Sequence, residues 1–293
     1  MSSLSALGED GLLRELERRG LAGPLGDDTA VLDGGLVVTQ DALVEGIHFR
    51  LEWTTWRDLG YKAAAVNLSD LAAAGAEPEA LVVSLAAPPG SAVDDVIELY
   101  EGLNEPRVPV RGGDTARAER LYLSVTALGR SDRVPGRAGA RPGDLLVVTG
   151  PLGGAAAGLA ALERGLPGFE ELVEVHNRPP LRLAEGRALA GVAHALMDLS
   201  DGIATDAARL AARSSCAVEI EAELLPLAPR LAEVGEEPFW TLGEDYELLA
   251  ALDPEDARSS GYVVVGRCLE GSGCRVTRAG EPLDLSGWDH FRV

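Results

Sequence analysis

Apolar positions and turn-forming residues alternate along the chain in a pattern that predicts interleaved helices and strands. Apolar residues at helical spacing predict an amphipathic helix from Glu9 to Arg19, closed by Gly20. The segment LVVTQD (residues 36–41) predicts a buried strand that ends on an acid, and the alanine-rich segment 58–74 predicts a long helix. The further elements expected in this half are a strand at 80–87, a helix at 93–103, a short strand before Gly112 and a strand at 120–129.

A segment rich in glycine, proline and arginine, GRSDRVPGRAGARPGD (129–144), separates this half from a second one. The second half begins with the strand LLVVTG and the glycine-rich turn GPLGGAAAG, and helices follow across 155–190. A strand HALMD, a helix at 203–213 and several strands between 217 and 278 complete it. We therefore predict a mixed α/β (α+β) fold of two domains, residues 1–137 and 138–293.

Composition narrows the class of protein. The 293 residues include 47 Asp and Glu against 26 Lys and Arg, which gives a net charge of −21. A nucleic-acid binder needs basic surface to displace counterions, so nucleic acid is not an expected partner. The 46% of hydrophobic residues suffices for a core. The first twenty residues contain acids and no apolar run of the length typical of a signal peptide, and no stretch approaches 18 uninterrupted apolar residues, so we expect neither a signal peptide nor a membrane span. Three cysteines without CxxC spacing favour a reduced compartment, so we expect a cytoplasmic protein without membrane contact.

Aspartates recur at strand ends and in turns bordered by small residues. A single aspartate in such a place is common because it caps helices and turns. Together they would repel one another unless cations such as Mg²⁺ were bound, and Mg²⁺ prefers to share its ligands with phosphates. The pattern therefore suggests phosphoryl transfer. The residues are Asp27, Asp28, Asp41, Asp70, Asp114, Asp198 and Asp201.

The usual nucleotide-binding motifs are missing from this sequence. There is no P-loop motif, since the single lysine, Lys62, lies in LGYKAAAV, and there is no protein-kinase motif set. The turn GPLGGAAAG has two interpretations, a phosphate contact or close packing. For Lys62 we favour a structural ion pair or a surface position over a phosphate contact.

Longer motifs resemble those of the thiamine-monophosphate kinase family, in order and spacing, over residues 26–291. They are GDDTAVL, VVTQDALVEGIHF, DLGYKAAAVNLSDLAAAGAEP, GGDT, RAGARPGDLLVVTG, MDLSDGIATD, GEDYELL and WDHF. The superfamily also contains aminoimidazole ribonucleotide synthetase and selenophosphate synthetase. The resemblance implies ATP-dependent phosphorylation of thiamine monophosphate to thiamine diphosphate by a two-domain enzyme. It also implies a homodimer formed through the N-terminal half, which holds ATP and Mg²⁺, and a C-terminal half that completes the site.

The resemblance also implies the residues of the site. Several Mg²⁺ ions would be held by Asp28, Thr39, Gln40, Asp41, Asp70, Asp114, Asp198 and Asp201, with Gln40 acting through its carbonyl. ATP would contact Tyr100, Gly113, Asp114, Arg137 and Ser200, and thiamine monophosphate would contact His48, Glu244 and Phe291. Packing roles are the alternatives for His48, Tyr100 and Phe291. No general base is expected, because a phosphate monoester has a second pKa of about 6 and is already ionised near neutral pH.

The sequence departs from the family pattern at three places. Leu242 replaces the first glycine of GGED, Gln40 replaces a threonine, and the segment RVPVR before GGD is short. Two other activities of the superfamily are weaker alternatives. Selenophosphate synthesis lacks its N-terminal cysteine and lysine here, and the motifs GEDYELL and WDHF oppose aminoimidazole synthesis. An acidic scaffold without catalysis would explain the charge but not the placement of the aspartates.

Overall fold

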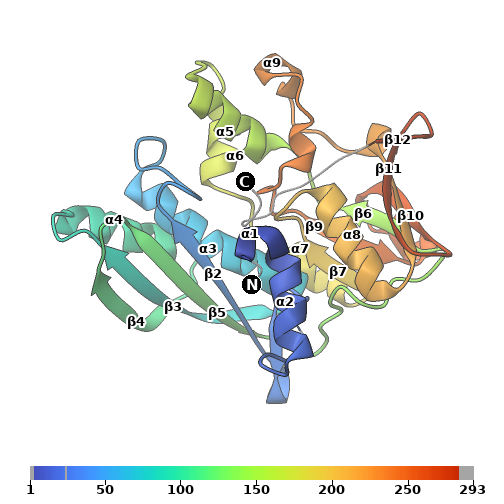
Figure 1. Ribbon diagram of the computed structural model, residues 1–293, viewed down its shortest axis with the longest axis horizontal. Coiled ribbons are helices and arrows are strands. Elements are labelled where there is room, and N and C mark those ends of the chain that lie inside the picture. The colour runs from blue at the N-terminus through green and yellow to red at the C-terminus, as the bar shows by residue number, and fades with distance from the viewer. Residues whose placement is uncertain (1–2, 24, 284–293) are drawn as a thin grey trace.

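The computed structural model describes residues 3–23 and 25–283, and it contains two β-sheets that lie next to each other (Figure 1). The first sheet has the order β1-β2-β5-β3-β4, in which β3 and β4 are parallel and the other pairs antiparallel. Its strands are β1 (Ala30–Leu32), β2 (Leu36–Val44), β3 (Glu77–Ala87), β4 (Val110–Arg117) and β5 (Tyr122–Arg130). The sheet therefore contains every described strand of the N-terminal half.

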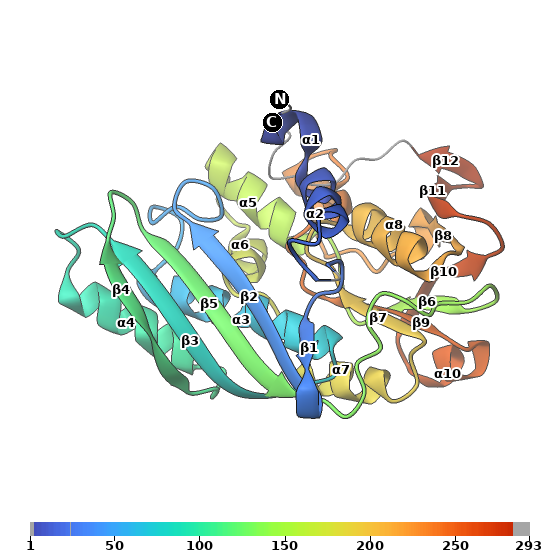
Figure 2. The same cartoon turned by 60° about the horizontal axis from the view of Figure 1, so that its bottom comes forward.

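Two helices cover one face of the first sheet, α3 (Trp56–Ala73) and α4 (Val93–Asn104). They pack closely because Gly60 and Gly102 lie where they cross. A Cβ atom on Gly60 would stand 1.9 Å from the carbonyl oxygen of Leu99. Among the described residues no helix covers the opposite face of the sheet, which faces the viewer in Figure 2. Tyr122 and Val82 on the strands β5 and β3 are both exposed.

The second sheet has the order β12-β11-β8-β10-β6-β9-β7. Its strands are β6 (Leu145–Val148), β7 (Ala195–Asp198), β8 (Ala217–Glu221), β9 (Leu248–Leu252), β10 (Val263–Leu269), β11 (Gly273–Arg278) and β12 (Glu281–Leu283). Alternate residues of its strands enter two separate cores, because successive side chains point to opposite faces. One core includes α8 (Ile203–Ser214), and the other includes α7 (Leu183–Ala190) and α10 (Pro254–Ser259).

Helix α3 joins the two halves. Its last buried alanines, Ala72 and Ala73, pack into the core of the second sheet against Leu196 and Ala250. Earlier residues of the same helix, such as Leu59 and Leu68, belong to the core of the first sheet. The alanine-rich composition allows this, because small side chains let the helix be buried on nearly all sides. A side chain on α3 is therefore fixed relative to both sheets.

The remaining helices form two groups. Helices α5 (Gly154–Arg164) and α6 (Glu170–Asn177) form a hairpin near α9 (Leu231–Val234), and α1 (Leu4–Leu7) and α2 (Glu9–Arg18) lie between the sheets in Figure 1. None of the helices within residues 3–23 and 25–283 is long and apolar enough to cross a membrane.

Most elements agree with the expected ones, but two strand ends differ. The strand that begins at Leu36 does not end on Asp41; it continues to Val44 because all nine residues pair with β5. The strand expected to end before Gly112 instead begins at Val110 and runs to Arg117, because β3 pairs with it over this length apart from an irregularity at Arg111. The domain boundary expected after residue 137 lies between the last strand of one sheet and the first of the other, and it stays a prediction.

Candidate active site

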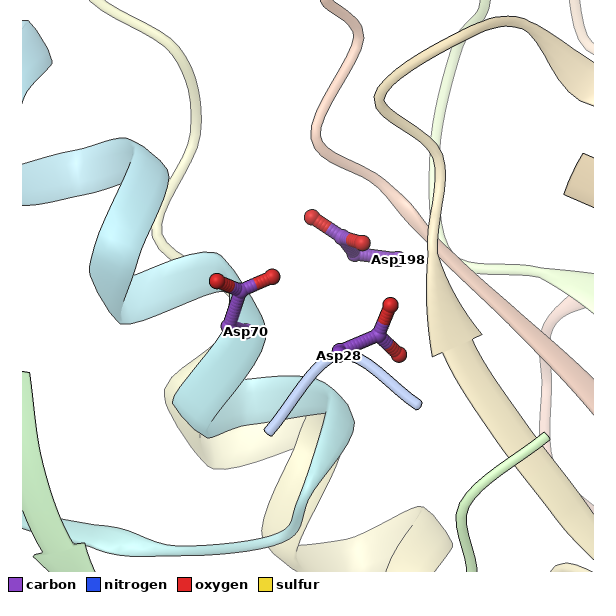
Figure 3. Close-up of side chains that lie close together, drawn as sticks. All are labelled: Asp28, Asp70 and Asp198. Atoms are coloured by element: carbon purple, nitrogen blue, oxygen red, sulfur yellow. The ribbon is translucent and has the colours of Figure 1, made fainter. Parts of the chain in front are cut away.

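Three aspartates far apart in the sequence converge between the two halves (Figure 3). Asp28 lies in the loop before β1, Asp70 in the last turn of α3, and Asp198 at the end of β7. Each contributes one carboxylate oxygen to a group in which all oxygens lie within 4.8 Å of one another. Because the three come from different elements of both halves, the group exists only in the folded chain.

Hydrogen bonds fix the orientation of these carboxylates. The Thr39 hydroxyl donates to Asp70 Oδ2 at 2.5 Å, and the buried Ser69 hydroxyl donates to Asp198 Oδ2 at 2.7 Å. The Arg137 guanidinium forms an ion pair with Asp28. The carboxylates are thus held in place before any ligand binds.

The electrostatics of this group favour a bound cation. Burial raises the pKa of Asp70 and of Asp198 well above the usual value, and neighbouring carboxylates raise both further. The pKa of Asp28 is also raised, again chiefly by burial, although Arg137 opposes the shift. Three carboxylate oxygens within reach of one ion are a hard donor set that fits Mg²⁺. Asp41 adds to the pKa shift of Asp70 and belongs to the same negative region.

A cavity of about 550 Å³ surrounds the three carboxylates. Nine of the residues expected in the metal and nucleotide sites line it: Asp28, Thr39, Gln40, Asp41, Asp70, Arg137, Asp198, Ser200 and Asp201. Four arginines line it as well, and only Arg137 among them was expected; the others are Arg14, Arg209 and Arg213. The cavity therefore offers acidic groups for cations beside guanidinium groups for phosphate oxygens.

Sequence reasoning missed the residues that hold Asp201. Arg209 forms ion pairs with Asp201 and with the fully buried Asp206, and Asp206 Oδ2 accepts a hydrogen bond from the Asp201 amide at 3.0 Å. Burial, with the charge of Asp201, raises the pKa of Asp206 to about 7. The spacing in DGIATDAAR contains a signal for this group, since residues three apart lie side by side on a helix.

Asp114 and Gly113 lie apart from the cavity. In the register of the sheet, Asp114 of β4 is the cross-strand partner of Ser84 in β3, and Ser84 is the partner of Ser124 in β5. Ser124 is in turn the partner of Ala42 in β2, so these four side chains share one face of the sheet. Because side chains alternate across a strand, Asp114 points to the open face of the sheet, whereas Asp41 points to the helix-covered face. The two strands are also three spacings apart, about 14 Å. Within one chain, Asp114 therefore does not join the carboxylate group.

Other expected residues take several positions. Tyr100 packs against the core of the first half and does not line the cavity, and Gln40 donates through Nε2 to the Ser124 hydroxyl at 2.7 Å on the open face. His48 lies in the loop after β2, where its Nδ1 accepts a hydrogen bond from the Val44 amide at 3.1 Å. Phe291 lies outside the described residues. The roles of these residues toward ligands stay predictions.

The three acidic side chains of GEDYE (residues 243–247) form ion pairs or hydrogen bonds with three different segments of the chain. Glu244 pairs with Lys62 of α3, and Glu247 pairs with Arg182. Asp245 accepts hydrogen bonds from the Gly153 amide at the start of α5. Its pKa is raised to about 8, chiefly by burial. This turn therefore links α3, α5 and the second sheet.

The departure at Leu242 is compatible with this backbone. Leu242 has φ −96°, which any residue adopts, whereas Gly243 has φ +85° and a Cβ atom there would stand 2.2 Å from the Ser200 carbonyl oxygen. The glycine that the turn requires is thus the one that is retained.

Known proteins match nearly the whole chain. Family models described as AIR synthase related protein, N-terminal domain and C-terminal domain, match residues 26–131 and 141–278. Thiamine-monophosphate kinase of Aquifex aeolicus strain VF5 is 35% identical over 98% of this chain and 99% of its own length. The Salmonella typhimurium strain LT2 enzyme is 37% identical, with 91% of each chain covered. A solved structure of AaThiL complexed with AMPPCP and TMP superimposes with a TM-score of 0.92, at 34% identity, over 99% of both chains.

Proposed function

Since this chain belongs to the thiamine-monophosphate kinase family, we propose that it transfers the γ-phosphoryl group of ATP directly to thiamine monophosphate, assisted by several Mg²⁺ ions. The observation that carries the proposal is the convergence of Asp28, Asp70 and Asp198 beside Arg137 in one cavity. The binding of AMPPCP and TMP to the AaThiL neighbour supports the same pair of substrates.

The carboxylates and arginines divide the work of handling two polyanions. Asp28, Asp41, Asp70 and Asp198 would hold Mg²⁺, which when bound neutralises charge on the phosphates. Arg137 would donate hydrogen bonds to phosphate oxygens, and the buried Ser69 and Thr39 hydroxyls would keep their carboxylate partners in place. No side chain needs to remove a proton, because the acceptor is an ionised phosphate. Catalysis would thus rest on positioning and charge neutralisation.

Glu244 is suited to the nitrogen-rich end of thiamine monophosphate. Burial alone would raise the pKa of Glu244, but Lys62 and His176 lower it to about 2, so the carboxylate is ionised at neutral pH. The Glu244 amide donates to the Ser200 carbonyl at 2.8 Å, two residues beyond Asp198. Glu244, which would bind the substrate, and Asp198 of the metal group therefore lie on adjoining backbone segments. A substrate with a cationic end and a phosphate end requires such an arrangement.

The assay for this function uses purified protein, Mg·ATP and thiamine monophosphate. We expect thiamine diphosphate and ADP in equal amounts, measured by chromatography, and no thiamine diphosphate when Mg²⁺ is omitted. Release of free phosphate without thiamine diphosphate would overturn the proposed function.

The dimer implied by the family resemblance would bring Asp114 to the site. Strand β4 is an exposed edge of the first sheet, and the adjoining face of that sheet is open. At the other edge, the pairing with β1 covers the first three residues of β2, Leu36–Val38. We infer that the first sheets of two copies pack together, and that Asp114 and Gly113 reach the site of the other copy.

Complementation between inactive variants tests this arrangement. Asp70→Asn and Asp114→Asn are each expected to be inactive. After subunit exchange, half of the dimers are mixed and one of their two sites is intact, so about a quarter of wild-type activity should return. Assays of thiamine diphosphate formation measure the recovery.

The matched control mixes Asp70→Asn with Asp198→Asn, whose residues belong to the same chain's site, and no activity should return. Failure of the first mixture to recover activity, in samples that sedimentation shows to be mixed dimers, would place Asp114 outside the site of the other copy.

A further inference from the structure

Lys62, the only lysine of the chain, is buried in the middle of α3. Its side chain is 3% exposed, and Nζ lies 3.1 Å from Glu244 Oε2. The two residues are 182 positions apart in the sequence and belong to different halves of the molecule. Burial of an ammonium group is costly unless it is paired, so this contact holds the two halves in one arrangement.

The same oxygen of Glu244 also faces His176 in the last turn of α6. The imidazole is 5% exposed, and its Nδ1 lies 3.2 Å from Oε2 without the alignment of a hydrogen bond. Burial and the charge of Lys62 lower the pKa of His176, so the ring is neutral at pH 7. Lys62 is therefore the main cationic partner of Glu244, and its charge is the largest influence that lowers the pKa of that carboxyl.

The second oxygen of Glu244 is left for a ligand. Among residues 3–23 and 25–283, no hydrogen bond or ion pair to Oε1 is found. The backbone at Glu244 has φ +60°, a conformation that costs energy for a residue with a side chain. Such strain persists only where the surroundings impose it, and here the ion pair with Lys62 and the hydrogen bond from the Glu244 amide to the Ser200 carbonyl do so.

We propose that Lys62 is a positioning residue of the thiamine-monophosphate site, which acts through Glu244. It holds one carboxylate oxygen and keeps the group ionised, so that the other oxygen can accept a hydrogen bond from the substrate's aminopyrimidine end. This inference rests on the proposed function, in which Glu244 binds thiamine monophosphate. Asp70 lies eight residues beyond Lys62 along α3, a rise of about 12 Å. Because Lys62 holds Glu244 and Asp70 belongs to the metal group, this helix sets the spacing between Glu244 and the metal group.

Steady-state kinetics of Lys62→Met, Lys62→Arg, Glu244→Gln and the double variant Lys62→Met/Glu244→Gln test the proposal. We expect Lys62→Met to raise KM for thiamine monophosphate by about tenfold or more, with KM for ATP changed by less than about twofold. Lys62→Arg should restore part of the affinity, because it keeps the charge. In the Glu244→Gln background, Lys62→Met should add no further increase, since the two act through one contact.

The control is Arg267→Met, which removes one of the two arginines that pair with Glu219 on the second sheet and should leave both KM values unchanged. Equal changes in both KM values, or effects of Lys62→Met and Glu244→Gln that multiply, would overturn the inference. If Lys62→Met does not fold, the double variant, which has neither charge, is compared with Glu244→Gln alone. An equal or lower KM for thiamine monophosphate then supports the inference, and a higher one overturns it. A wild-type protein that makes no thiamine diphosphate would defeat the proposed function instead.

Discussion

Replacement of Asp70 by asparagine is expected to lower kcat by at least about 1,000-fold while the protein stays folded. Asp70 is the carboxylate that faces Asp28 and Asp198 from α3, and burial together with these neighbours raises its pKa well above the usual value. An asparagine keeps the shape and can still accept the Thr39 hydrogen bond, but it cannot neutralise a cation. Rates of thiamine diphosphate formation at saturating substrates measure the effect.

The same substitution should make the metal-free protein more stable to heat, because it removes one of several mutually repelling buried carboxylates. Asp94→Asn, the same change at an exposed position in the first turn of α4, is the matched control and should alter neither property. Unchanged turnover in folded Asp70→Asn protein would remove Asp70 from the metal site.

Mg²⁺ is expected to raise the melting temperature of the wild-type protein by about 5–10 °C at saturation, and to do so more at pH 8 than at pH 5. Without metal, the raised pKa values of Asp70 and Asp198 mean that the folded state binds more protons than the unfolded state above about pH 4. The stability that these two carboxyl groups contribute is therefore present at low pH and is lost as the pH rises. Mg²⁺ reverses this trend because it binds the ionised carboxylates.

Differential scanning calorimetry with EDTA or with MgCl₂ at the two pH values measures this effect. Asp70→Asn/Asp198→Asn serves as the comparison, because it lacks two of the three converging carboxylates and should melt at nearly the same temperature with and without Mg²⁺. A wild-type melting temperature that does not respond to Mg²⁺ at pH 8 would contradict a metal site at this place.

Sequence patterns located most helices and strands because those elements follow local hydrophobic periodicity. The long helix expected at 58–74 is α3 at Trp56–Ala73, and the expected helix at 203–213 is α8 at Ile203–Ser214. The expected ends of the strands at Asp41 and before Gly112 were wrong, since strand pairing depends on the neighbouring strand rather than on the segment itself. Gly113 illustrates the point. A Cβ atom there would stand 1.8 Å from the Val83 carbonyl oxygen, so its glycine serves close strand packing.

For the site, the sequence by itself determined the kind of chemistry. Aspartates in small-residue contexts, together with motifs in a fixed order, indicated the family and a magnesium-dependent phosphoryl transfer, because residue type and local spacing are readable from the chain. Only the tertiary structure decided which of these residues meet. It brings Asp28, Asp70 and Asp198 together, turns Asp114 to the other face of the sheet, and pairs Lys62 with Glu244 across 182 positions. The physical reason is that these contacts depend on the packing of α3 between two sheets and on strand register, and neither is encoded in any single segment.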